Sequence, residues 1–122
     1  MKILLIEDNL LNQKVVMYFL RKYKYDITTV IDGNDAVEVI INNNFDLILM
    51  DIMLPGMNGF EITYEIRKFE KENKISKPVV IIALTAATYN NDRDKCILAG
   101  MDDYLSKPFT AEQLNNKIKK FF

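Results

Sequence analysis

Short runs of apolar residues recur along the chain, separated by longer stretches in which apolar and polar positions alternate. Three runs are uninterrupted, at residues 3–6, 47–50 and 79–84. Continuous apolar runs of this length are typical of strands buried on both faces of a sheet. The runs at residues 27–31 and 104–105 are interrupted by polar residues or very short, so we expect edge strands there.

The stretches between the runs place apolar residues at the three- and four-residue spacing of amphipathic helices. Four such stripes are expected to pack on the sheet: Leu11, Val15, Tyr18 and Phe19; Ala36, Val37, Ile40 and Ile41; Ile62, Ile66 and Phe69; Leu114, Ile118 and Phe121. A fifth, weaker helix is expected over about residues 90–99, ended by Gly100 in a left-handed conformation. Thr110 and Gln113 have the spacing of a capping box at the start of the last helix.

The order of these elements predicts the architecture. Strands that alternate with helices form a parallel sheet that is covered on both faces and joined by right-handed crossovers. Three central and two edge strands suit a doubly wound α/β fold with five parallel strands in the order 2-1-3-4-5. Residues 1–122 have the size of one domain, and no linker or repeat divides them, so we expect a single domain.

Composition and charge exclude several classes of function. Sixteen Lys and Arg against 17 Asp and Glu leave a net charge of −1, which provides no basic field for nucleic acid or anionic lipid. The chain has no histidine, which excludes His-ligated zinc and Ser-His or Cys-His nucleophile pairs. Cys96 is the single cysteine, and no apolar segment is long enough for a signal peptide or a membrane span. We therefore expect a cytoplasmic protein without membrane contact.

Charged and hydroxyl side chains follow the apolar runs. Glu7 and Asp8 come after the first run. Asp51, Thr85 and Lys107 come at or just past the ends of the later ones. Because the carboxyl ends of parallel strands meet at one edge of the sheet, these side chains should converge there. Each residue alone has an ordinary structural explanation, such as a helix cap, but together they predict a functional site.

The predicted cluster has the chemistry of a metal and phosphoryl site. Three carboxylates held close together repel one another unless a cation shares the site. Oxygen ligands without histidine or thiolate suit a hard ion such as Mg²⁺, which also accepts a phosphate oxygen. Lys107 can pair first with a carboxylate and later with a phosphoryl oxygen. Such a site could transfer a phosphoryl group to an aspartate.

Four motifs, in their order and spacing, closely resemble the receiver domain of two-component response regulators. They are LIEDN at residues 5–9, LMDIMLPGMNG at 49–59, ALTA at 83–86 and DYLSKPF at 103–109. The resemblance covers essentially the whole chain and implies a flavodoxin-like fold of five βα units.

The resemblance also implies a role for each site residue. Asp51 is the expected phosphoacceptor, Thr85 and Lys107 are expected to hold the phosphoryl oxygens, and Tyr104 is expected to follow Thr85 on activation. The expected protein ligands of Mg²⁺ all offer oxygen and are Glu7, Asp8, Asp51 and the backbone carbonyl of Met53. The sequence departs from many relatives at two positions that flank the acceptor, where apolar residues replace polar ones: Met53 and Ala87.

The implied function is signalling rather than that of a conventional enzyme. The chain is expected to catalyse its own phosphorylation from a histidine kinase or histidine phosphotransfer protein, to dephosphorylate itself, and to regulate a partner as a monomer or weak dimer. The segments EDN at 7–9, NQKV at 12–15 and CILAGMDDY at 96–104 look like receivers of hybrid sensor histidine kinases. This leaves open a relay function, in which the phosphoryl group is passed on to a histidine phosphotransfer protein.

Two other phosphate-handling proteins fit these residues less well. An FMN protein of the flavodoxin type needs a glycine- and hydroxyl-rich loop after the first strand, where Glu7 and Asp8 would repel the flavin phosphate. A phosphatase of the haloacid dehalogenase type needs a second aspartate two residues after its nucleophile, and Met53 occupies that place.

Two local features are also expected. The Lys107–Pro108 bond is expected to be cis, because Lys107 must point back into the site while the chain turns away, whereas the bonds before Pro55 and Pro78 are expected to be trans. Residues 10–20 contain too many apolar side chains for one buried stripe, so some should face outward beside the site.

Overall fold

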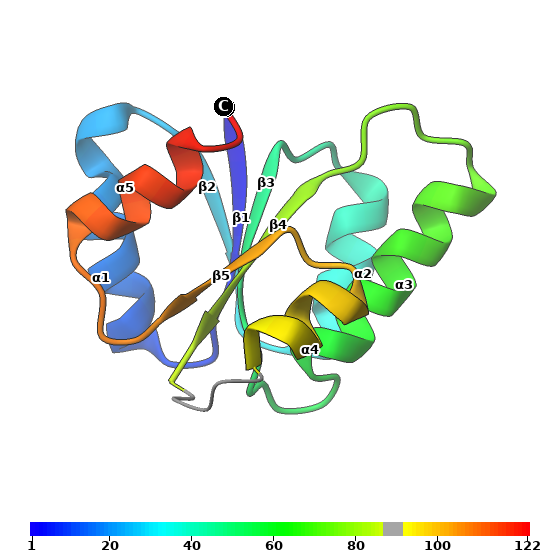
Figure 1. Ribbon diagram of the computed structural model, residues 1–122, viewed down its shortest axis with the longest axis horizontal. Coiled ribbons are helices and arrows are strands. Elements are labelled where there is room, and N and C mark those ends of the chain that lie inside the picture. Colours follow the sequence, from blue (N-terminus) through cyan, green and yellow to red (C-terminus); the bar gives the residue numbers. More distant parts are fainter. Residues whose placement is uncertain (87–91) are drawn as a thin grey trace.

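A five-stranded parallel sheet lies between two layers of helices in the computed structural model, which describes residues 1–86 and 92–122 (Figure 1). The strands are β1 (Lys2–Ile6), β2 (Asp26–Val30), β3 (Leu47–Asp51), β4 (Val80–Thr85) and β5 (Asp103–Ser106). Their order is β2-β1-β3-β4-β5, which confirms the predicted doubly wound topology with β2 and β5 at the edges. The helices are α1 (Leu10–Leu20), the short 3₁₀ helix η1 (Arg21–Tyr23), α2 (Gly33–Asn42), α3 (Gly59–Glu72), α4 (Asp92–Ala99) and α5 (Ala111–Lys119).

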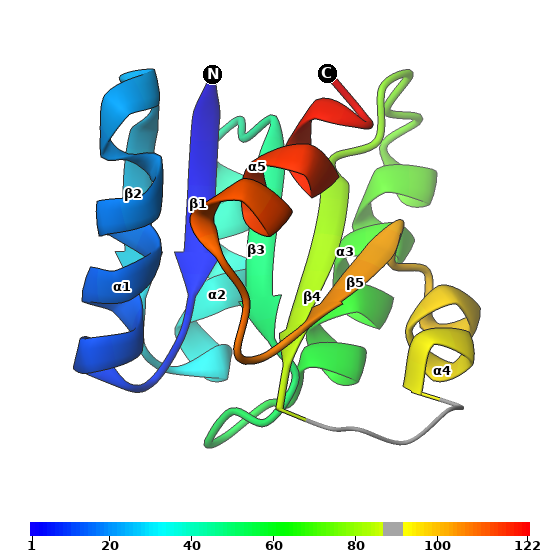
Figure 2. The ribbon, with the colours of Figure 1, turned by 60° about the vertical axis from the view of Figure 1, so that its left-hand side comes forward.

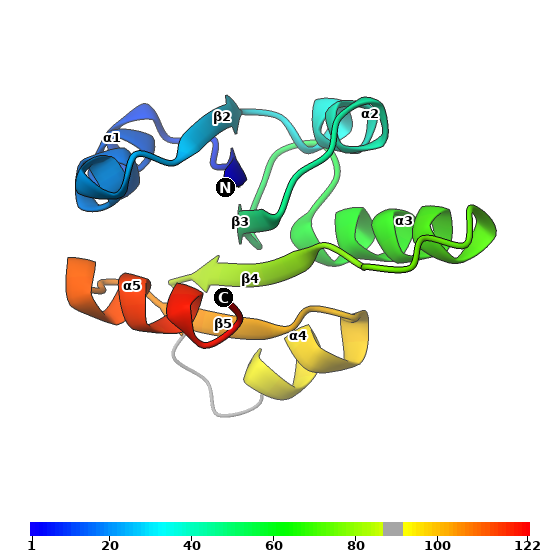
Figure 3. The ribbon, with the colours of Figure 1, turned by 90° about the horizontal axis from the view of Figure 1, so that it is seen from above.

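The helices are divided between the two faces of the sheet. α1 and α5 cover one face, and α2, α3 and α4 cover the other (Figure 3). Successive residues of β1 belong to different core clusters. Ile3 is in the cluster that contains Leu20 of α1 and Leu114 of α5, whereas Leu4 is in the cluster that contains Ile62 of α3. Both faces of the central strands are therefore apolar, which is why these strands appear in the sequence as unbroken runs.

All five strands point the same way, so their carboxyl ends lie at one end of the sheet. The loops after β1, β3 and β5 lie at this end, and both chain ends lie at the other (Figure 2). Asp51 and Thr85 are the last residues of β3 and β4, where they pair with Leu84 and Ser106 of the next strands. The strand register therefore brings the predicted site residues to a common edge.

The buried face of α1 differs from the predicted stripe. Gln13, Val16 and Leu20 are buried, whereas Leu11 is 69% and Tyr18 59% exposed. Apolar residues occupy most of α1, so periodicity alone allows several stripes. Gln13 can lie on the buried face because its side-chain amide donates to the backbone carbonyl of Glu7, just after β1, at 2.7 Å. The expectation that part of the apolar surface faces outward is confirmed.

Several local predictions are confirmed. Gly100 follows α4 with φ +107°, and Thr110 and Gln113 form a reciprocal capping box on α5. The Lys107–Pro108 bond is cis, and the bonds before Pro55 and Pro78 are trans. Positions 90 and 91 of the helix predicted over about residues 90–99 lie outside the described residues. No helix in the described ranges is both long and apolar enough to span a bilayer.

Candidate functional site

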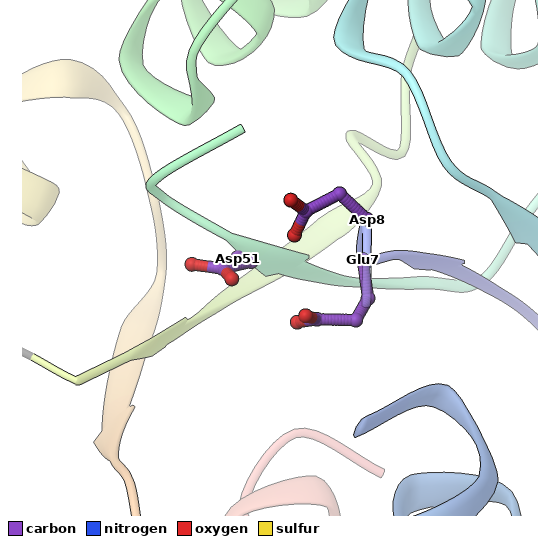
Figure 4. Close-up of side chains that lie close together, drawn as sticks. All are labelled: Glu7, Asp8 and Asp51. Atoms are coloured by element: carbon purple, nitrogen blue, oxygen red, sulfur yellow. The ribbon is translucent and has the colours of Figure 1, made fainter. Parts of the chain in front are cut away.

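Three carboxylates meet at the carboxyl ends of β1 and β3. Glu7 and Asp8 directly follow β1, and their side chains extend toward Asp51 at the end of β3 (Figure 4). One carboxylate oxygen of each residue lies within 4.8 Å of the other two. Glu7 is 1% and Asp51 8% exposed, whereas Asp8 is exposed to solvent. The cluster is therefore a largely buried anionic site that opens at Asp8.

Lys107 supplies a positive charge to this cluster from the turn after β5. Its Nζ donates to Oε2 of Glu7 at 3.0 Å and to Oδ2 of Asp51 at 3.2 Å. Burial by itself lowers the pKa of Lys107, but the hydrogen bond to Glu7 and the charges of Asp51 and Glu7 outweigh it and raise the pKa above the ordinary value of 10.5. Lys107 is therefore an ammonium ion at neutral pH.

The first turn of α1 orients Glu7. The Asn12 side-chain amide donates to Oε1 of Glu7 at 3.2 Å, and the Asn9 backbone N–H donates to the same oxygen at 3.3 Å. Gln13 donates from Nε2 to the backbone carbonyl of Glu7 at 2.7 Å. Sequence reasoning assigned no site role to Asn12 or Gln13. The signal was present, because Gln13 is a polar residue at helical spacing from the apolar Val16 and Leu20.

The loop after β3 fixes the Asp51 carboxylate from the other side. The Met53 backbone N–H donates to Oδ1 of Asp51 at 3.0 Å. The Met53 side chain points outward and is 76% exposed. Each carboxylate oxygen of Asp51 thus accepts a hydrogen bond, one from Met53 and one from Lys107.

Thr85 and Tyr104 occupy the neighbouring strands. Thr85 is 1% exposed at the end of β4, and its carbonyl accepts from the backbone N–H of Lys107 at 2.7 Å. Tyr104 is half-buried on β5 opposite Ala83 and packs against the core on the α2–α4 side. The structure therefore brings Thr85 to the same edge as Asp51 and Lys107 and places Tyr104 one strand away. The other predicted flanking residue, Ala87, lies outside the described residues.

The donor set fits a hard divalent cation. Glu7, Asp8 and Asp51 offer only oxygen, and Asp8 leaves one side of the cluster open to solvent. A small cation that keeps several waters needs such an open side, and Mg²⁺ is commonly held by one or two carboxylates. These residues could therefore hold Mg²⁺ without rearrangement of the fold.

An apolar groove of about 410 Å³ adjoins the carboxylate cluster. α1 contributes Asn12, Val15 and Phe19, and the turn after β5 contributes Pro108 and Phe109. The rings of Phe19 and Phe109 meet edge to face with centroids 6.0 Å apart. The groove thus links the exposed side of α1 to the site.

Comparisons with known proteins show the family of this chain. The family model described as the response regulator receiver domain matches residues 3–119. The chain is similar to the response regulator mcs4 of Schizosaccharomyces pombe, with 36% identity over 98% of this chain and 27% of that protein. It is also similar to hybrid signal transduction histidine kinase B of Dictyostelium discoideum, with 43% identity over 98% of this chain and 6% of that protein. The chain thus spans a minor part of either relative.

Solved structures of receiver domains are also similar to this chain. The receiver domain of Saccharomyces cerevisiae Ssk1, crystallised with the histidine phosphotransfer signaling protein Ypd1, has a TM-score of 0.93 and 38% identity, covering 99% of this chain and 88% of that chain. The receiver domain of the Pseudomonas aeruginosa PAO1 sensor histidine kinase PA1611 has a TM-score of 0.85 and 42% identity, covering 98% of this chain and 95% of that chain. That second structure holds a magnesium ion in its active site cleft.

Proposed function

This chain belongs to the response regulator receiver domain family, and we propose that it accepts a phosphoryl group on Asp51 from a phosphohistidine donor. The observation that carries the proposal is the position of Asp51, whose two carboxylate oxygens are held by Met53 and Lys107 beside the carboxylates of Glu7 and Asp8. Phosphoryl transfer depends mainly on positioning and charge neutralisation, and these residues provide both. We propose that residues 1–122 act as a single receiver domain.

The proposed reaction moves one phosphoryl group. A carboxylate oxygen of Asp51 forms a bond to phosphorus as the phosphorus–nitrogen bond of the donor phosphohistidine breaks, and the electron pair of that bond passes to the imidazole nitrogen. Lys107 leaves its contact with the free carboxylate to hold a phosphoryl oxygen, and the Thr85 hydroxyl binds another. In hydrolysis, a water oxygen bonds to phosphorus as the bond from phosphorus to the Asp51 oxygen breaks, which releases inorganic phosphate and restores the Asp51 carboxylate.

We assign the metal to the carboxylate cluster. Glu7, Asp8, Asp51 and the backbone carbonyl of Met53 would hold Mg²⁺, with waters completing its shell. When bound, the ion neutralises the charge that gathers on the carboxylates and phosphoryl oxygens. The magnesium ion in the related PA1611 receiver supports this assignment.

The partner surface is assigned to α1 and the groove beside it. Leu11 and Tyr18 are exposed on α1, and the groove carries apolar surface up to Lys107. Single exposed apolar residues are common, but a continuous apolar strip beside a reactive group is typical of a docking surface. The crystallised pairing of the Ssk1 receiver with Ypd1 supports a histidine phosphotransfer protein as the partner.

The proposed partner surface is positively charged as well as apolar. Residues 10–25 contain four basic side chains, Lys14, Arg21, Lys22 and Lys24, and no acidic one. Arg21 lies over the Tyr18 ring, 4.1 Å from its centroid, which holds the cation beside the apolar strip. A partner helix with apolar residues and an acidic rim would complement this face.

A second function uses the same site in the opposite direction. The similarity to Dictyostelium hybrid histidine kinases B and K supports a relay in which Asp51 passes its phosphoryl group to a histidine phosphotransfer protein. Mixing the phosphorylated chain with Ypd1 separates the two functions, because a relay intermediate labels Ypd1, whereas a terminal receiver retains the label.

Labelling by a small phosphodonor tests the site directly. The protein is incubated with acetyl phosphate and Mg²⁺, and intact mass is compared between the wild type and Asp51→Asn. We expect one phosphoryl group on the wild type, none on the variant, and none after chelation of Mg²⁺. Asp26→Asn, at an exposed carboxylate of β2, is the matched control and should label normally. Labelling of Asp51→Asn, or labelling that is insensitive to chelation, would refute the assignment.

A further inference from the structure

The loop of residues 52–58 joins β3 to α3. It runs from the carboxylate cluster to a contact with the first turn of α2. It begins directly after Asp51, and its Met53 N–H donates to Oδ1 of Asp51 at 3.0 Å. At the base of the loop, the Gly59 N–H donates to the carbonyl of Ile52, also at 3.0 Å. The start of the loop is thus tied to the site, and its tip lies against another element.

Gly33, the first residue of α2, touches the backbone of this loop. A Cβ atom placed on Gly33 would collide with the carbonyl oxygen of Met57 and lie 2.8 Å from the carbonyl carbon of the same residue. The Gly33 N–H donates to the carbonyl of Pro55 at 3.4 Å. Because the atoms in the way belong to the backbone, they cannot rotate aside as a side-chain end can. Any larger residue at position 33 must therefore displace the loop.

A second glycine, Gly56 in the loop itself, also allows the loop to approach the first turn of α2 closely. Gly56 has φ +75°, a conformation that L side chains rarely adopt, and a Cβ there would lie 2.7 Å from Oδ1 of Asp32. The same oxygen accepts the hydrogen bond from the Asn34 N–H, at 2.8 Å, that caps α2. The capped turn of α2 and the tip of the loop therefore fit together through a glycine on each side.

We propose that Gly33 is a positioning residue for the metal and phosphoryl site. By letting the loop lie against α2, it keeps the Met53 N–H on the Asp51 carboxylate and the Met53 carbonyl in place for Mg²⁺. The role of the carbonyl rests on the proposed function, whereas the hydrogen bond from the Met53 N–H to Asp51 is observed in the structure itself. Residues that orient the ligands of a metal typically change its affinity about 10- to 100-fold when they are altered.

Gly33→Ala tests the proposal, with Mg²⁺ affinity measured by isothermal titration calorimetry. We expect the Mg²⁺ dissociation constant to rise at least about tenfold. Gly100→Ala is the matched control, since Gly100 has φ +107° and its Cβ would lie 3.1 Å from Cγ of Arg67, away from the site. This control should lose stability but keep the wild-type Mg²⁺ affinity. Unchanged affinity in Gly33→Ala, or an equal loss in Gly100→Ala, overturns the proposal.

If Gly33→Ala fails to fold, Gly56→Ala decides the question. Its Cβ would meet the ends of the Asp32 and Asn34 side chains, which can move, so we expect the protein to fold. Its backbone at φ +75° is strained by any side chain, so the tip of the loop should shift and Mg²⁺ affinity should fall, though less than in Gly33→Ala. Unchanged affinity in this variant overturns the proposal.

A second measurement separates this inference from the proposed function. In metal-free protein, the amide resonances of Met53 and Asp51 should move in Gly33→Ala, or in Gly56→Ala if the first does not fold, whereas those of α5 should not. If the Met53 resonance moves in the variant but the wild type accepts no phosphoryl group, the positioning role of Gly33 is supported and the proposed function is wrong. If the Met53 resonance does not move in the variant, the proposed positioning role of Gly33 is wrong, whatever the labelling result.

Discussion

The Lys107 ammonium group lies 3.0 Å from the Glu7 carboxylate, although 100 residues separate the two in the chain. The Glu7 side chain is 2% exposed and that of Lys107 21%, so the pair is largely shielded from water. It ties the turn after β5 to the end of β1, on either side of Asp51. The same ammonium group contacts Asp51 at 3.2 Å, so Lys107 neutralises two carboxylates that would otherwise be buried without a cation.

Lys107→Met should lower the free energy of unfolding, and the loss should be larger without Mg²⁺ than with it. Removing one partner leaves a buried carboxylate without its cation, which costs about 3 kcal/mol of unfolding free energy. Mg²⁺ should restore part of this loss, because it neutralises the same carboxylates. Urea unfolding with and without Mg²⁺ measures both values. Lys14→Met, at an exposed lysine of α1, is the control and should change neither. An equal loss in both conditions contradicts the shared role.

Asp103 should make stability depend on pH at acid pH. Burial raises the pKa of Asp103, but hydrogen bonds from the Tyr104 amide, Lys117 and Lys120 outweigh it and hold the pKa below its ordinary value of 3.8. Because the pKa of Asp103 is lower in the folded protein than in the unfolded chain, the ionised carboxylate stabilises the fold at pH values above the pKa of the unfolded chain. This stabilisation is lost as the pH falls through the pKa of the folded protein. Asp103→Asn should therefore cost about 2 kcal/mol at neutral pH.

The difference between the wild type and Asp103→Asn is measured by urea unfolding at a series of pH values. It should be constant down to about pH 5 and shrink below about pH 4. Asp26→Asn, at an exposed position, should show no such trend. A difference between the wild type and Asp103→Asn that does not change with pH would mean that the ion pairs with Lys117 and Lys120 do not stabilise the fold.

Leu11→Glu should slow transfer from a histidine phosphotransfer protein but leave labelling by acetyl phosphate intact. Leu11 is 69% exposed, so the substitution should keep the fold while placing a charge on the proposed docking surface. A loss of roughly tenfold in transfer rate from phosphorylated Ypd1 corresponds to about 1.4 kcal/mol. Leu98→Glu, at an 87% exposed leucine of α4, is the matched control. Similar slowing with both donors would indicate damage to the site or the fold rather than to docking.

Thr85→Ala should still accept a phosphoryl group yet lose the change around Tyr104. We expect the Thr85 hydroxyl to move toward the new phosphoryl oxygens and vacate space that the Tyr104 ring can enter, which shifts an existing equilibrium. NMR spectra with and without beryllofluoride measure the change. Ser106→Ala, on the strand paired with Thr85, is the control and should respond as the wild type does. A full response in Thr85→Ala would remove this residue from the switch.

The aspartyl phosphate should decay slowly, and Met53→Asn should speed its decay. Met53 is 76% exposed and lies two residues after Asp51, the proposed acceptor, and its thioether is only a weak hydrogen-bond acceptor for an attacking water. Restoring a polar group that positions the water is worth a factor of roughly 10 to 100 in rate. Decay of phosphorylated protein at fixed Mg²⁺ measures the effect, and Met17→Asn, on α1, serves as the control. An equal half-life in Met53→Asn and the wild type would show that this side chain does not control the water. The parallel variant, Ala87→Glu, changes a residue outside the described part of the chain.

The strand pattern and the carboxylate cluster could be predicted because each depends on short stretches of sequence. Buried parallel strands need apolar residues at consecutive positions, and their carboxyl ends share one edge whatever the packing between them. Residues placed at or just past the ends of the runs, such as Glu7, Asp51 and Lys107, therefore had to converge. The cap on α5 is equally local, since Thr110 and Gln113 are three residues apart.

The sequence by itself determined the order of strands and helices, the acidic cluster and the family to which the chain is similar. Only the tertiary structure decided which face of α1 is buried, that Gln13 holds the backbone of Glu7, and that Gly33 lies against Met57. These contacts join segments whose relative rotation and distance are set by packing across the whole sheet. Apolar periodicity along one helix does not contain that information, because several rotations of α1 bury a similar apolar area and the sheet selects one of them.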